Sequence, residues 1–241
     1  MRIISIVVFI LFLSGCVASD MTGRLDRGKG KIPATQYSNA NTVEEIRNLR
    51  PQAEIPLKIA VMPPKRWQGI SIEERKVIET WGKKLKETGF VESLEIIPKS
   101  LFPACDYQSD SNCYLNESRI AGARLGADAI LFLNDSTVTD SYINFAGILD
   151  ITIVGMWVVP SHHRDSYSVY EASLFDINNG YLYAVSEGHG ENKTLNPLMY
   201  TEYDTGQKDA RVQALNDLCE KLLVAAKKQV NKLSPTSGTP E

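Results

Sequence analysis

The chain contains 241 residues, of which 26 are basic and 29 acidic, so its formal net charge is only −3. A charge this close to zero argues against a nucleic-acid partner, because nucleic-acid-binding proteins carry clustered positive charge. The apolar fraction of 43% is ordinary for a globular protein and fits one domain flanked by tails.

Residues 1–15 predict a signal peptide. Arg2 supplies a short positive region, and Ile3–Leu13 is apolar apart from one serine. Eleven residues span about 16 Å as a helix, which is too short for a hydrocarbon core of ~30 Å. The segment ends in Leu13–Cys16, which is similar to the lipobox of bacterial lipoproteins. The alternative is an ordinary secretory signal followed by a chance cysteine.

The lipobox resemblance implies that Cys16 becomes the first residue of the mature chain and carries acyl chains. Two or more chains anchor a protein stably where one is marginal. In lipoproteins of this type an Asp after the cysteine retains the chain at the inner membrane, so Val17 favours the outer membrane. We therefore expect a lipid-anchored protein of the bacterial cell envelope, at the periplasmic face of the outer membrane, with membrane lipid bound through Cys16.

Residues 16–54 are polar and interrupted by glycines and prolines, which predicts a lipidated, flexible tether. One short helix is expected within it, because Thr42 and Glu45 form a capping box and Pro51 ends the pattern. Residues 55–233 are expected to form a single domain, and residues 234–241 a disordered tail.

The first half of the domain predicts a β-α-β unit. Lys58–Met62 and Leu94–Ile97 are short apolar runs, each ended by proline. Between them, Ser71 and Glu74 form a second capping box that opens a helix ending at Gly89. A crossover of this length permits parallel pairing of the two strands.

The second half predicts a helix at 116–125, a buried strand at Ala129–Leu133 and a long apolar-striped helix from Lys208 to Leu233. Three further runs are β-prone: Ile148–Val159, Val169–Ile177 and Tyr181–Glu187, with the turn signal Asn179–Gly180 between the last two. The expected fold class is α/β with α+β character. It has a mixed sheet of about six strands, in which a β-α-β-α start precedes an antiparallel meander of four, packed by three helices.

Several pieces of the chain resemble known envelope lipoproteins. The order of elements, Ile59–Pro63 and Leu125–Leu131 are similar to the lipoprotein folds around the TolB N-terminal domain, CsgG and LpoB. A closer resemblance is to the rhombotarget lipoproteins, through Pro56–Val61 with Trp67, Phe90–Pro98, Thr152–Gly155 with Val158–Pro160, and Glu171–Ile177. These resemblances imply an accessory protein, mostly without enzymatic activity, and they bring no catalytic residue or cofactor with them.

The three histidines are the weak candidates for a metal site. A two-residue turn at 179–180 would place His189 at the sheet end that carries His162 and His163, with Asp165 and Glu187 nearby. Imidazoles with a carboxylate could hold zinc. The alternative is ordinary loop histidines, since neighbouring residues usually point apart.

The cysteines other than Cys16 suggest one disulfide and one buried thiol. Cys105 and Cys113 enclose seven residues of an irregular loop, so in an oxidising compartment we expect them to be bridged. The alternative is two free thiols. Cys219 lies on the apolar stripe of the last helix, which predicts a buried free thiol.

We expect a non-enzymatic binding or accessory module without a cofactor, whose partner is an unknown envelope protein. The candidate binding loop is Ser161–Tyr167, which offers His162, His163, Arg164 and Tyr167. Two alternatives stay open: a metal-dependent hydrolase that uses His162, His163 and His189, and a structural subunit of a homo-oligomer.

Overall fold

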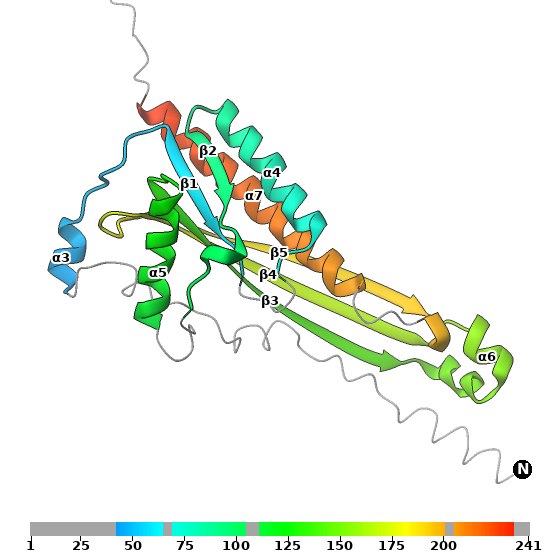
Figure 1. The fold of residues 1–241 in the computed structure, drawn as a ribbon. Helices are drawn as coiled ribbons and strands as arrows, with labels where there is room; N and C mark the ends of the chain where they lie inside the picture. The colour runs from blue at the N-terminus through cyan, green and yellow to red at the C-terminus, as the bar shows by residue number, and fades with distance from the viewer. Residues whose placement is uncertain (1–41, 65–68, 105–110, 201–204, 234–241) are drawn as a thin grey trace, which may run out of the picture.

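The structure is a computed structural model that describes residues 42–64, 69–104, 111–200 and 205–233. Within these residues, five strands form one mixed sheet in the order β2-β1-β3-β4-β5 (Figure 1). The expected fold class, a mixed sheet packed by helices, is confirmed.

The first half of the domain is the expected β-α-β unit: β1 (Leu57–Met62), α4 (Ile72–Glu87) and β2 (Val91–Ile96). The Ser71 hydroxyl accepts from the Glu74 amide at 3.1 Å, and the Glu74 carboxylate accepts from the Ser71 amide at 2.6 Å, so the predicted capping box opens α4. After α4, Gly89 adopts a φ of 76°, which suits glycine and ends the helix. β1 and β2 pair in parallel, as expected.

The second half of the sheet is built from long strands. These are β3 (Ala129–Ile143), β4 (His162–Asp176) and β5 (Leu182–Asn196), each of 15 residues and paired antiparallel in that order. Only the first four residues of β3, 129–132, pair with β1, in parallel. The three strands therefore run far past the six-residue strands β1 and β2, and Figure 1 shows them extending toward α6.

The strand expected at residues 148–159 is wrong. These residues belong to a 3-10 helix, η3 (Phe145–Ile151), and to α6 (Ile153–Val158). The described part of the chain thus has five strands rather than about six, and three rather than four form the antiparallel part. β-branched residues favour strands, but here two side-chain caps and a crossing of the two helices decide the local conformation.

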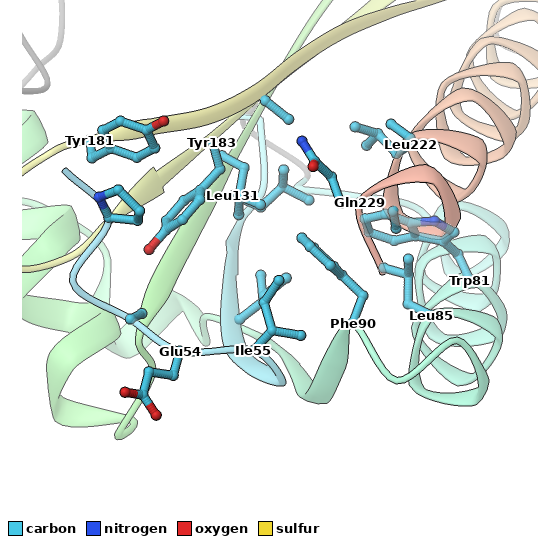
Figure 2. Close-up of a pocket in the computed structure, with 17 residues that line it drawn as sticks. Glu54, Ile55, Trp81, Leu85, Phe90, Leu131, Tyr181, Tyr183, Leu222 and Gln229 are labelled. Carbon is cyan, nitrogen blue, oxygen red and sulfur yellow. The ribbon is translucent and has the colours of Figure 1, made fainter. Parts of the chain in front are cut away.

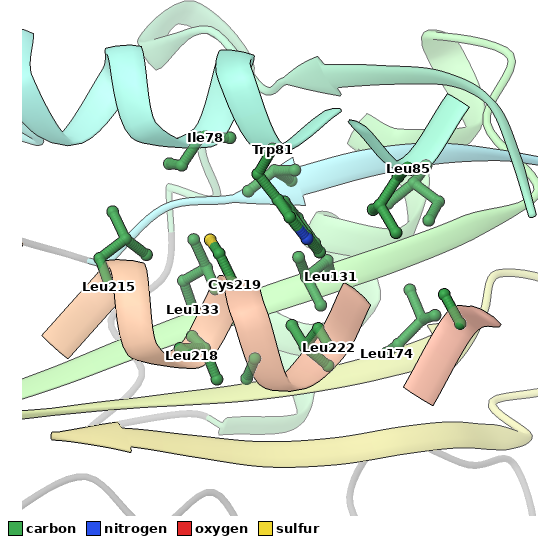
Figure 3. Close-up of a cluster of buried hydrophobic side chains, with 14 of the residues drawn as sticks. Ile78, Trp81, Leu85, Leu131, Leu133, Leu174, Leu215, Leu218, Cys219 and Leu222 are labelled. Carbon is green, nitrogen blue, oxygen red and sulfur yellow. The ribbon is translucent and has the colours of Figure 1, made fainter. Parts of the chain in front are cut away.

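The helices cover both faces of the sheet near β1. α4 and α7 (Thr205–Leu233) pack on one face, and α5 (Ser111–Arg124) packs on the other. β1 and the start of β3 are consequently buried on both faces, which explains their continuous apolar runs. Figure 3 shows the larger core, where α4 and α7 face each other over β3 and β4 through Ile78, Trp81, Leu85, Leu131, Leu218, Cys219 and Leu222. The buried apolar stripe of α7, including the free thiol of Cys219, is confirmed.

α7 lies unusually close to β5. A Cβ at Gly188 would lie 2.2 Å from the carbonyl oxygen of Ala214, and one at Gly190 would lie 2.0 Å from that of Ala210. Ala210 and Ala214 are themselves fully buried. Two glycines on the strand and two alanines on the helix therefore allow backbone to approach backbone, so small residues determine where α7 sits.

The chain preceding β1 is held against the turn between β4 and β5. α3 (Val43–Asn48) is the short helix expected in the tether, opened by the predicted Thr42 capping box. Beyond it, the buried carboxylate of Asp176 accepts from the amides of Gln52 at 2.9 Å and Ala53 at 3.2 Å. The last residues of the expected tether thus contact the domain. Two further single turns, η2 (Lys99–Leu101) and η4 (Leu198–Tyr200), complete the described elements. No helix in the described ranges is both long and apolar enough to span a membrane.

Candidate functional site

The far end of the β3–β4 hairpin carries two short helices, and we call residues 145–160 the apolar tip. Asn144 opens η3 because its side-chain oxygen accepts a backbone amide at 2.9 Å, and the Thr152 hydroxyl opens α6 in the same way at 2.9 Å. Gly155 is required where α6 crosses η3, since a Cβ there would lie 1.9 Å from a carbonyl oxygen of η3. These local interactions fold a β-prone sequence into a helical cap.

The apolar tip exposes most of its hydrophobic side chains. Phe145 is 90% exposed and Ile151 is 85% exposed. No residue of η3 is buried, and in α6 only Gly155 is buried. Six more large hydrophobic residues of the tip are exposed: Ile148, Leu149, Ile153, Val154, Trp157 and Val158. Monomeric soluble proteins rarely leave so much contiguous apolar surface in water, and such patches mark contacts with a protein or a membrane.

The only charged residue between positions 145 and 160 is Asp150, and its carboxylate faces the base of the tip. One carboxylate oxygen accepts from the Ser161 hydroxyl at 2.7 Å and lies 3.6 Å from Nδ1 of His162. Ser161 is fully buried, and its carbonyl oxygen accepts from the Asn144 amide at 2.9 Å. The polar groups thus fix the base of the tip to the sheet, which leaves the rest of its surface apolar.

The predicted binding loop is wrong as a loop, because residues 162–167 begin β4. His162 and His163 lie on opposite faces of the strand: His162 contacts Asp150, whereas His163 stacks on Tyr142 with ring centroids 4.7 Å apart. Arg164 is buried, with 8% of its surface exposed, on the face that α7 covers. These residues do lie at one end of the sheet, next to the tip, and their role in binding stays a prediction.

The three histidines do not form one site. His189 pairs with Val169 and His162 pairs with Asn196, so His162 and His189 lie seven positions apart along the ladder, about 24 Å. The turn between β4 and β5 is longer than the expected two residues, and β4 continues through residues 162–167, where a loop was predicted. His189 instead bonds to the Tyr167 hydroxyl at 3.0 Å and to the Glu187 carboxylate at 3.0 Å. Among the described residues, no three His, Cys, Asp or Glu side chains are close enough to share a metal ion.

The remaining candidate residues fall partly outside the described ranges. Cys16 lies there, so the lipid anchor stays a prediction. Cys105 lies there as well, while Cys113 belongs to α5. The expected bridge between them stays a prediction.

The sequence reasoning missed the apolar tip, although a signal for it was present. Sixteen consecutive residues, 145–160, contain a single charge. The interpretation as a strand placed Ile151, Ile153, Trp157 and Val159 together on one side of this run. The absence of polar alternation in the run argued instead for a surface that contacts something apolar on several sides.

No protein-family model matches this sequence, and no curated protein matches it. Among solved structures, the chain is similar to the PelC dodecamer from Paraburkholderia phytofirmans, with 11% identity over 69% of this chain and 86% of that chain and a TM-score of 0.33. It is similar to a lipoprotein from Neisseria meningitidis, with 14% identity over 73% of this chain and 99% of that chain and a TM-score of 0.31. A hemagglutinin homolog from Helicobacter pylori shares 9% identity over 78% of this chain and 94% of that chain, with a TM-score of 0.37. Likenesses this distant assign no function, and the resemblance to the rhombotarget lipoproteins stays a prediction.

Proposed function

We propose that this chain is a lipid-anchored, non-enzymatic accessory module of the bacterial cell envelope, which binds another envelope protein through its apolar tip. The exposed hydrophobic surface of residues 145–160 is the observation that carries the proposal. The lipobox at Leu13–Cys16 supports the location. The choice of the outer membrane rather than the inner membrane rests on Val17 alone.

The geometry of the chain favours a protein partner over the anchoring membrane. α3 and the β4–β5 turn lie at the end of the sheet opposite the tip (Figure 1). The 15 residues of β3 alone span about 50 Å. If residues 16–41 form the expected tether, a relaxed coil of 26 residues reaches only about 25–30 Å. The expected tether then joins the domain at the end opposite the tip, which leaves the tip free to contact other envelope components.

The chemistry of the tip also fits a protein partner. Its centre is aliphatic, and Trp157 packs edge-on against Tyr200 at its side, with ring centroids 5.8 Å apart. Aromatic residues around an apolar, charge-depleted centre are typical of protein interfaces.

In-cell photocrosslinking from the full-length protein tests the proposal. A photoreactive residue at Phe145 or Ile153 should give a crosslink to a specific envelope protein. The matched control is Val43, which is 67% exposed and lies on α3 at the opposite end, and which should not give that crosslink. Crosslinks only to lipid, or the same crosslinks from all three positions, would overturn the proposal. Crosslinks only to a second copy of the chain would replace the heterologous partner with a homo-oligomer.

A further inference from the structure

A second candidate site lies at the end of the molecule opposite the tip. It is a cavity of about 650 Å³ between the sheet, α4 and the C-terminal half of α7. Figure 2 shows Ile55 and Phe90 beside it, with Tyr183 of β5 and Leu222 and Gln229 of α7 around them. Its volume is within the range of small-molecule and cofactor sites, roughly 300–1,000 Å³.

One wall of the cavity is the segment that precedes β1. Ala53, Glu54 and Ile55 line the cavity, and the Asp176 carboxylate holds this segment through the amide of Ala53. The same carboxylate accepts from the Tyr183 hydroxyl, another lining residue, at 2.8 Å. Burial, together with this hydrogen bond to a carboxylate, raises the pKa of Tyr183, so its hydroxyl stays protonated and remains the donor. The wall is thus tied to the sheet by a buried acid.

The lining selects for an apolar ligand without a negative charge. Of its 17 residues, 12 are aliphatic, Pro or Phe and carry no polar side-chain atom. The other five are Glu54, Trp81, Tyr181, Tyr183 and Gln229. The lining has no Lys, Arg or His, so it offers no cation to pair with a buried carboxylate or phosphate.

Two neutral side chains of the lining, Tyr181 and Gln229, can donate a hydrogen bond to an uncharged acceptor such as an ester carbonyl. Gln229 is exposed and Tyr181 is half-buried, so the polar end of such a ligand would lie at the rim of the cavity.

We propose that this cavity binds one acyl chain of a membrane glycerolipid, whose ester end lies at the rim near Tyr181 and Gln229. The position of the cavity favours a membrane lipid as the ligand. The wall at residues 51–55 continues directly into the segment that leads back to the lipobox. The cavity therefore lies at the end of the domain from which the expected tether leaves. This site is independent of the apolar tip, and shares with the proposed function only the membrane anchor.

Photolabelling of the full-length protein in lipid vesicles tests the inference. The probe is a phosphatidylethanolamine that carries a diazirine in one acyl chain, and labelled peptides are located by mass spectrometry. Label is expected on the α7 peptide that contains Leu222 and Ala226, which line the cavity. The same diazirine on a free fatty acid should label this peptide less, because no cation of the lining pairs with its carboxylate.

Two tryptophan variants of α7 form a matched pair. Ala225 lines the cavity and is exposed on α7, so Ala225→Trp should fill the space and abolish the label on α7 without disturbing the core. Val224→Trp, one residue away and 67% exposed outside the lining, should keep it. Ala184→Phe fills the cavity from β5 and should act like Ala225→Trp. Melting temperatures show that each variant is folded.

The outcomes separate this site from the tip. Loss of the α7 label in the two filling variants, while crosslinking from Phe145 is unchanged, supports the lipid site. Equal labelling in Ala225→Trp and Val224→Trp, or no label on α7 in the parent protein, overturns it. If the label on α7 appears only in Cys16→Ser, which retains no acyl group of its own, the occupant is the protein's own anchor and the membrane lipid is ruled out as the source.

Discussion

Replacing Gly190 by Ala should separate α7 from the sheet. The new Cβ would lie 2.0 Å from the carbonyl oxygen of Ala210, whereas an ordinary contact is at least 3.4 Å. The difference, 3.4 − 2.0 = 1.4 Å, has to come from movement of backbone, because neither atom belongs to a flexible side chain. A gap of 0.5–1 Å already removes about a quarter to a half of the dispersion energy of a contact.

The expected cost is at the upper end of the range for overpacking. Such substitutions cost roughly 1–3 kcal/mol, and here the shift affects the interface of β5 with much of α7. We expect about 3 kcal/mol, which lowers the melting temperature of a domain of this size by about 6–12 °C.

The assay is thermal unfolding followed by circular dichroism, with Gly126→Ala as the matched control. Gly126 has a φ of 72° and nothing within 4 Å of its Cβ position, so alanine there meets only backbone strain of about 1–2 kcal/mol. Gly190→Ala should therefore destabilise more than Gly126→Ala. If Gly190→Ala lowers the melting temperature by less than about 2 °C, the loss of stability is under about 1 kcal/mol. This result would refute the close approach of α7 to β5.

Three further predictions concern the cysteines. Cells fed labelled palmitate should label the protein, and Cys16→Ala should remove the label; a labelled variant would exclude the lipobox. Peptide mapping without reduction should recover Cys105 and Cys113 as one linked peptide, and free alkylation of both thiols would contradict this. Burial raises the pKa of the Cys219 thiol from 9.0 to about 12. Because the unfolded chain loses this proton first, stability should fall between pH 9 and pH 12, and Cys219→Ala should reduce that slope. An identical slope in the variant would show that Cys219 is not buried.

Local signals in the sequence determined where the regular elements of the core begin. Thr42 and Ser71 each precede a Glu at the third position, and this pair of residues satisfies helix amides without help from the rest of the fold. The apolar stripe of α7 and the apolar run that opens β3 also sufficed to predict these two elements. Burial of one helix face leaves a periodic apolar pattern, and burial of both strand faces leaves a continuous apolar run. The predicted anchor, too, rests on sequence alone, since a lipobox is recognised as a linear motif.

The distal halves of β3 and β4 could not be predicted this way. The face that α7 covers there is polar: Ser166 and Ser168 are fully buried and bond to Thr139 and Thr137 at 3.0 Å and 2.9 Å. A strand whose buried face carries hydroxyl groups shows no apolar alternation, so it was interpreted as a loop. With the strand shortened, His162 and His189 were placed at one end of the sheet.

Tertiary structure alone decided the two candidate sites. The run Ile148–Val159 has the composition of a strand. In the described residues, however, the β3–β4 ladder ends at the pair Ile143 and His162, and the run forms the connection between these two strands. The Asn144 and Thr152 caps then make helices the better way to satisfy its backbone amides. The cavity similarly depends on residues from six separate helices and strands and on Asp176, whose carboxylate ties the chain before β1 to the β4–β5 turn. Such contacts join positions more than 120 residues apart, and no local pattern encodes them because their energy exists only once the sheet has brought the two segments together.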